Sequence, residues 1–319
     1  MNLISEFLSK KLPLLIILAA ILTYFSPIYW DAPGWVPGVL LGIVIFFTGL
    51  SMDITAIKDV GKKKKELFIA SMLKWTLTVG VSLGLAYLFF SSRPEIAAGV
   101  ILSGTVPSAT AATLYTFLAG GNTSLVIAAS LLDVGISPIV TLLAMAGLPG
   151  NQVTISFVSL LQSFLFIVVI PLFLGIIVQR LFPTAREHSK SLTRFGSSVS
   201  LLLIIHTIVG DGKDTIAREA EILPLIVLAA FLQVVLPMGL AYVIAKKIGV
   251  KEEEARAVLF HVGLCNTALA AILAFEFIGE LGALPPIINM IINLSVGAFI
   301  ANRLSLRRPS LGAWHPKGL

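Results

Sequence analysis

Three ionisable residues, Lys74, Asp133 and His261, interrupt long apolar stretches of this sequence. Each lies about seven to ten residues from one end of its stretch, which places all three roughly 10–16 Å deep if the stretches are membrane helices. A charged side chain at that depth costs on the order of 2.5–3.5 kcal/mol and often marks an ion or substrate path. A Lys–Asp pair would offset part of this cost, and a nearby histidine would add a group that titrates near neutral pH. Simpler interpretations stay open: a snorkelling Lys74, an Asp133 that only balances it, and a His261 that is a hydrogen-bonded core residue.

The composition indicates that the chain is an integral membrane protein. The chain is 57% hydrophobic and 13% charged, whereas soluble domains carry about 25% charged residues. Apolar runs of about 20 residues recur along the chain, the length needed to cross a bilayer. We predict an all-α integral membrane protein of one domain, 1–319, with ten transmembrane helices. These are 12–30, 35–55, 66–90, 95–119, 123–147, 153–179, 195–210, 222–245, 254–278 and 282–302.

Two of these segments need comment. The segment 195–210 is the least apolar, because it contains Ser197, Ser198, Ser200 and His206. The first segment is interpreted as a retained helix, because no small-residue cleavage site follows its long apolar run.

The basic residues predict the orientation. With the N-terminus inside, nearly all of the 23 lysines and arginines fall in inner loops; Arg93, Lys213 and Arg218 are outer, and Lys74 lies within a helix. This asymmetry predicts a multi-pass protein of the cell inner (plasma) membrane with both termini cytoplasmic. The same residues explain the net charge of +6 through contact with lipid headgroups, so no nucleic-acid partner is expected.

A repeat relates the two halves of the chain. An offset of 159 residues aligns EIAAGVILSGTVPSATAATLYTFLAG (95–120) with EARAVLFHVGLCNTALAAILAFEFIG (254–279) without a gap, pairing Gly104 with Gly263. The two segments are the fourth and ninth predicted helices, which run in opposite directions. We therefore predict an inverted five-helix repeat, about 10–150 and 151–305, an arrangement typical of secondary transporters.

Both repeated helices are expected to break at the same depth, at Gly104–Pro107 and at Gly263–Asn266. Proline removes a backbone donor, and Ser, Thr and Asn favour helix starts. A simple proline kink is the alternative for either helix alone. Two half-helices would begin near the midplane with free N–H groups, which favour an anion. The predicted substrate-binding residues are Ser108, Ala109, Thr110, Asn266, Thr267 and Asn293.

These features resemble the bile acid:sodium symporter family. The local sequence agrees in GVILSGTVPSATAATLYTFLAGGNTSL, and in VGLCNTALAA followed by NLSVGA. The resemblance covers nearly the whole chain. It implies a core of helices 3–5 and 8–10, a panel of helices 1, 2, 6 and 7, and a substrate between them. Bacterial members of the family carry small organic anions, including bile salts and pantoate-type monocarboxylates.

The sodium ligands implied by the resemblance are altered here. The family's Ser-Asn pair of the fourth helix is replaced by Ala112 and Thr113, and its hydroxyl of the fifth helix matches Ser130. A glutamate and a glutamine of the ninth helix correspond to His261 and Cys265, and a glutamine of the third helix corresponds to Lys74. Thr113 and Ser130 are then the remnant of a first sodium site. We hypothesise that Lys74 takes the place of the second sodium, with Asp133 as its counter-ion.

The sequence thus predicts a secondary active transporter that moves a small organic anion, such as a carboxylate, by alternating access. The side chains expected to determine ion coupling are Lys74, Thr113, Ser130, Asp133, His261 and Cys265. The altered ligands argue against sodium coupling, with a proton-coupled carrier or a uniporter as the alternatives, and no cofactor is expected. A channel would need a continuous polar lining. An intramembrane enzyme would need Ser108 or Cys265 beside His261, and no protease motif accompanies them.

Overall fold

The computed structural model describes residues 2–52, 63–146 and 156–306, and helices make up most of these ranges. The α-helices are α1 (Asn2–Phe25), α2 (Val36–Ser51), α4 (Lys64–Leu73), α5 (Val79–Phe90), α6 (Pro94–Thr105), α7 (Thr110–Leu118), α8 (Thr123–Ala146), α9 (Phe157–Phe164), α10 (Ile170–Leu181), α11 (Pro183–Arg218), α12 (Leu223–Lys247), α13 (Glu252–Gly263), α14 (Thr267–Phe277) and α15 (Glu280–Ser305). Two π-helical turns, η1 (Lys74–Thr78) and η2 (Leu165–Val169), and a 3₁₀ turn, η3 (Ala220–Ile222), join some of them.

Each of the ten predicted segments contains helix. Within the described ranges, six helical stretches are long and apolar enough to cross a membrane: Lys64–Phe90, Thr123–Ala146, Val158–Leu181, Phe195–Arg218, Ala220–Lys247 and Glu280–Ser305. The weakest predicted segment, 195–210, lies inside α11 and is shorter than the helix that contains it. Serines weaken its hydropathy, but α11 is fixed by packing along α1 and α2.

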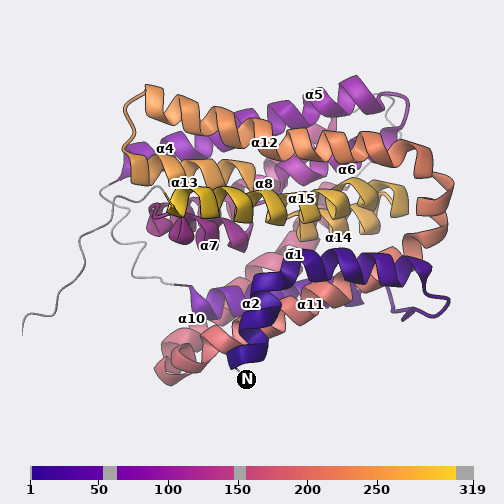
Figure 1. Ribbon diagram of the computed structural model, residues 1–319, viewed down its shortest axis with the longest axis horizontal. Helices are drawn as coiled ribbons and strands as arrows, with labels where there is room; N and C mark the ends of the chain where they lie inside the picture. Colours follow the sequence, from indigo (N-terminus) through magenta and orange to yellow (C-terminus); the bar gives the residue numbers. More distant parts are fainter. Residues whose placement is uncertain (1, 53–62, 147–155, 307–319) are drawn as a thin grey trace, which may run out of the picture.

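The helices form two layers, which are visible in Figure 1. The panel, drawn below, consists of α1, α2, α9, η2, α10 and α11, which pack mainly on one another. The core layer above contains α4 to α8 with η1, and α12 to α15. The layers meet through α1 and α11 against α15, and through α2 against α14.

Both predicted helix breaks are present. Helix α6 ends at Thr105 because Val106 is extended (φ −79°, ψ 161°) and Pro107 has no N–H to continue the helix. Helix α13 ends at Gly263, and α14 starts at Thr267. Each broken pair therefore supplies two half-helices, and the core layer leaves the two breaks facing each other.

The two breaks are joined by backbone hydrogen bonds. Ala109 N–H donates to the Leu264 carbonyl, and Asn266 N–H donates to the Pro107 carbonyl, both at 2.8 Å. They form an isolated antiparallel bridge between Ser108 and Cys265. Pro107 and Asn266 are also the residues that the 159-residue offset pairs. We call this meeting point the crossing.

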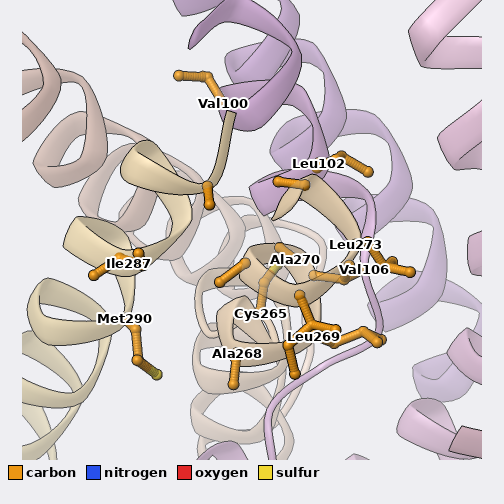
Figure 2. Packing of buried hydrophobic residues seen from close by; sticks show 14 of the residues in the cluster. Val100, Leu102, Val106, Cys265, Ala268, Leu269, Ala270, Leu273, Ile287 and Met290 are labelled. Atoms are coloured by element: carbon orange, nitrogen blue, oxygen red, sulfur yellow. The ribbon is translucent and has the colours of Figure 1, made fainter. Parts of the chain in front are cut away.

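Apolar side chains surround the crossing. Figure 2 shows part of one buried cluster that includes Val106, Leu269 and Leu273, together with Ile287 and Met290 of α15. Because these side chains exclude water, the backbone groups of the crossing must pair with each other or with buried polar side chains.

Ion pairs at the two ends of the core layer follow the predicted alternation of the loops. At one end, Lys63 before α4 contacts Glu254 of α13. At the other end, Arg93 before α6 contacts Glu219 after α11 at 2.8 Å. The first end holds the loops predicted to be inner and the second the loops predicted to be outer; we call them the inner and outer ends.

Close helix packing in the core depends on Gly99. A Cβ built at this position in α6 would lie 2.0 Å from the carbonyl oxygen of Gly282 in α15. We expect Gly99→Ala to lower the free energy of unfolding by about 1–3 kcal/mol, since a backbone atom cannot move aside as a side chain can. Thermal unfolding in detergent measures this effect. Gly84→Ala, where nothing lies within 4 Å, is the matched control and should not be destabilised; equal losses in both variants would contradict the packing argument.

Candidate functional site

The three ionisable residues of the apolar segments meet in the core layer. Lys74 Nζ lies 3.0 Å from Asp133 Oδ2, and both side chains are 0% exposed. His261 Nε2 lies 3.7 Å from the same oxygen, with its side chain 1% exposed. We call these three residues the charge cluster. The contact expected from depth alone between Lys74 and Asp133 is therefore present.

Local helix geometry positions each member of the cluster. Lys74 is the first residue of the π turn η1, between α4 and α5. Such turns insert one extra residue in a helix and are frequent at functional sites. Asp133 lies in the middle of α8, and His261 lies in the last turn of α13, just before the break. The cluster therefore lies directly behind the crossing.

Hydrogen bonds connect the cluster to the crossing through Ser108. The Ser108 N–H donates to Asp133 Oδ2 at 3.1 Å, and the Ser108 hydroxyl donates to the His261 carbonyl at 2.5 Å. Asp133 Oδ2 is thus shared by an ammonium group and a backbone N–H. Movement of this carboxylate would therefore displace or release the backbone that leads into α7.

A cavity of about 590 Å³ separates the panel from the core layer on the other side of Ser108. Its walls come from α1, α2, η2, α10 and α11 of the panel and from α7, α8, α15 and the crossing in the core layer. It extends from the crossing to Ser51 at the end of α2 and Thr123 at the start of α8. Because Thr123 adjoins Asn122, which contacts Glu254, the cavity extends towards the inner end.

Four of the six residues predicted to bind substrate line this cavity: Ser108, Ala109, Thr110 and Asn266. The other two are buried elsewhere in the core layer. Thr267 is 2% exposed, and Asn293 donates its amide to the Cys265 carbonyl at 2.7 Å. Asn293 therefore stabilises the backbone of the crossing.

The N-termini of the two half-helices differ. The Asn266 side chain caps α14 by accepting from Leu269 N–H at 3.3 Å. Ala109, which holds the N-cap position of α7, provides no side-chain cap. The first turn of α7, with Thr110 and Ala111, borders the cavity. The uncapped N-terminus at the cavity is therefore that of α7, a difference from α14 that the sequence did not reveal.

The residues at the sodium-ligand positions divide in the same way. Thr113 and Ser130 line the cavity, and Ser130 Oγ has no hydrogen-bond partner among the described residues. Cys265 is buried in the crossing as a free cysteine. At the second position the Lys74 ammonium lies against Asp133, so these residues do not fit a sodium ion there, because two cations would compete for one carboxylate.

Sequence reasoning missed the panel side of the cavity. Thr48 and Ser51 of α2 and Ser197 and Ser198 of α11 line it with hydroxyl groups. The serines of α11 were noticed only as residues that weaken a hydrophobic segment. Hydroxyl groups within an apolar helix are themselves a signal of a polar cavity, and that signal was available.

Beyond the crossing, polar contacts join the layers at the outer end. The Ser163 hydroxyl of α9 donates to Glu276 of α14 at 3.0 Å, and Thr215 of α11 donates to Glu280 of α15. The Arg93–Glu219 ion pair lies at the same end. Among the described residues, the cavity therefore extends towards the inner end, and these contacts join the layers at the outer end.

Known proteins are similar to this sequence over most of its length. Residues 38–219 match the profile of the Sodium Bile acid symporter family. "Uncharacterized sodium-dependent transporter YocS" of Bacillus subtilis is 27% identical over 310 residues, 93% of this chain and 92% of that protein. "Probable sodium/metabolite cotransporter BASS1, chloroplastic" of Arabidopsis thaliana is 24% identical, over 93% of this chain and 74% of that protein. Since the profile matches more than half of the chain, this multi-pass membrane transporter, which is not an enzyme, belongs to the sodium bile acid symporter family.

Proposed function

We propose that this transporter carries a small organic anion with one carboxylate group. The observation that carries the proposal is the uncapped N-terminus of α7, which borders the 590 Å³ cavity between the layers. Free N–H groups and the helix dipole favour a carboxylate at this place. The remaining substrate would contact hydroxyl groups such as Thr48 and Ser198, and apolar walls such as Leu131 and Val168.

The cavity also fits the size and charge of such a substrate. Its lining contains no ionised side chain among the described residues, so a multiply charged anion would lack counter-charges. The wall of the cavity at the crossing is formed by Ser108, Ala109, Thr110 and Asn266. Thr113 and Ser130 also line the cavity. A compact monocarboxylate such as pantoate is the first compound to test.

Movement is proposed to follow alternating access between the layers. The 159-residue repeat would relate the two halves as an inverted pair, and the contact between Pro107 and Asn266 supports this relation because the repeat pairs these residues. Among the described residues the cavity extends towards the inner end, and the contacts of Glu276 and Glu280 hold the outer end together. Transport would require these contacts to break and the inner cavity to close.

We propose further that sodium does not drive this carrier, although relatives are named as sodium-dependent. Lys74 supplies a tethered positive charge at Asp133, and Thr113 and Ser130 offer only hydroxyl oxygens at the first position. Neither place offers sodium an unpaired carboxylate.

Uptake of labelled pantoate into proteoliposomes tests this proposal. We expect uptake above that of protein-free liposomes, equal with an inward sodium gradient and with potassium in its place. Lys74→Gln combined with His261→Glu should introduce a sodium response, because the substitution removes an ammonium group and adds a carboxylate. Sodium-driven uptake by the unmodified protein would contradict the role of Lys74. Failure of pantoate and related monocarboxylates to exchange under any gradient would overturn the anion proposal.

A further inference from the structure

His261 is a buried imidazole without a hydrogen-bond partner on either ring nitrogen among the described residues. Asp133 Oδ1 likewise has no hydrogen-bond partner there. Buried polar groups are usually paired, and each exception needs an explanation. The imidazole and the carboxylate are also neighbours, with His261 Nε2 3.7 Å from Asp133 Oδ2. The Asp133 carboxylate can therefore accept a hydrogen bond from His261 Nε2 when that nitrogen carries a proton.

We propose that His261 Nε2 binds one proton, which crosses the membrane together with each substrate anion. This inference rests on the proposed anion carrier and adds its coupling ion. The proton binds the Nε2 lone pair from the same side as the anion and leaves from that nitrogen on the other side. No other bond changes, so one anion and one proton move with no net charge.

The charges of the cluster explain why the proton would follow the anion. Lys74 and Asp133 cancel each other, so the cluster with neutral His261 carries no net charge. Protonation of His261 gives it a charge of +1 in a site shielded from water, where an added charge is strongly unfavourable without a partner. An anion at the N-terminus of α7 supplies that partner. Each ligand then increases the affinity for the other by the same factor.

Ser108 is the physical connection between the two ligands. Its N–H binds the Asp133 oxygen that a protonated His261 would approach, and its side chain borders the cavity. When protonated His261 donates a hydrogen bond to this oxygen, the Ser108 N–H becomes free to donate to the substrate carboxylate instead. Proton binding therefore makes a donor available to the anion.

The groups packed around His261 come from several elements of the core layer. Lys74 of η1 and Asp133 of α8 are the charged groups that face it, and the Cys265 thiol lies on the segment that follows. From α7, the centroid of the Tyr115 ring lies 6.3 Å from that of Phe260, the residue before His261, and from α12 Met238 lies against Gly263. Helix α4 contributes the apolar Ala70 to the cluster of side chains around Val262.

The acidic residues of the inner end are poor candidates for such a response. Partial burial raises the pKa of Glu252, but hydrogen bonds from Arg256, Lys246 and Tyr242 outweigh it and hold this pKa at about 2. Burial also raises the pKa of Glu254, but the hydrogen bond from Lys63 outweighs it and this pKa is lowered. A lowered carboxyl pKa contributes stability that is lost only as the pH falls towards that value. Neither residue therefore changes its charge between pH 5 and 8.

The first test follows the protonation of His261 with and without pantoate. Protein labelled with ¹⁵N-histidine in detergent micelles is titrated by NMR from pH 8 to pH 5, and the His261 signals are assigned by their loss in His261→Gln. With saturating pantoate we expect Nε2 of His261 to change from the unprotonated to the protonated form within this range, and without an anion to stay unprotonated, because the added charge then lacks a partner. In Asp133→Asn the change should move to lower pH. An imidazole that stays neutral to pH 5 with pantoate bound, or one that is already protonated at pH 8 without it, overturns the proposal.

The second test measures charge movement in proteoliposomes with pantoate. An inward proton gradient of one pH unit should drive accumulation of up to about tenfold, the limit for one proton per anion, and an imposed membrane potential should not alter the initial rate. In His261→Gln the pH gradient should no longer drive uptake, while an inside-positive potential should. His206→Gln, which changes a histidine bonded to Thr23 and Trp30 far from the cluster, is the matched control and should behave as the parent.

The two tests separate this proposal from the anion carrier itself. Pantoate exchange that ignores the pH gradient, in parent and His261→Gln alike, would overturn the proton site and leave the carrier intact. A complete lack of exchange for monocarboxylates would overturn the carrier, whereas a His261 that stays neutral in the titration while pantoate is exchanged would overturn the proton site alone.

Discussion

Asp133→Ala is expected to lower the free energy of unfolding by about 3–5 kcal/mol, because it leaves the Lys74 ammonium buried without its counter-charge. Transport should be lost as well, since Ser108 N–H loses its acceptor and the crossing loses a support. Thermal unfolding in detergent, with pantoate exchange on the same preparation, measures both effects.

A double-variant cycle isolates the pair. Lys74→Met alone should also destabilise the protein, because it leaves a buried carboxylate. Lys74→Met combined with Asp133→Leu removes both charges, and apolar replacements of a buried pair are often neutral or stabilising. The double variant should therefore be more stable than either single variant, yet inactive. Simple addition of the two losses would show that the two charges are not energetically coupled.

Holding the outer end closed is expected to stop transport. Ser163 of α9 and Glu276 of α14 belong to different layers and are in contact. In the variant Ser163→Cys with Glu276→Cys, a short bis-methanethiosulfonate cross-linker, which forms a disulfide with each thiol and releases methanesulfinate, should reduce uptake by about tenfold or more, because the layers could not separate. A reducing agent should restore uptake. The native Cys265 is buried and should not react.

The control places the same cross-link inside one layer. Lys63→Cys with Glu254→Cys joins the start of α4 to α13, both in the core layer. Its cross-linking should leave uptake close to that of the uncross-linked variant, because the core layer moves as one body in the proposed cycle. Equal inhibition by both cross-links would contradict movement between the layers.

Much of the fold could be predicted from simple properties of the chain. Apolar length predicted the helices, and Pro107 and Asn266 with their neighbouring glycines predicted the two breaks, because these residues disfavour a continuous helix. Depth along each helix was enough to bring Lys74 and Asp133 to one level. Their contact followed, since a buried ammonium and a buried carboxylate strongly favour each other over apolar surroundings.

Other features of the site depend on rotation and packing, which a single sequence does not fix. The π turn at Lys74 changes the direction of its side chain, and nothing in the residues KWTLT signals it. Asn293 appeared equivalent to the anion-binding residues until its amide was found on the Cys265 carbonyl. The difference between α7 and α14 arose because Asn266 turns its own side chain to cap α14, whereas Ala109 has no side chain able to do so.

The crossing has an evolutionary consequence. Its two hydrogen bonds, Ala109 to Leu264 and Asn266 to Pro107, join main-chain atoms only. Substitution of the side chains at these positions therefore leaves the joint itself unchanged, provided that Pro107 is kept and no new proline removes a donor. A lineage could exchange a sodium ligand for an ammonium group or an imidazole without first rebuilding the scaffold. In such an architecture, the driving ion can diverge faster than the fold.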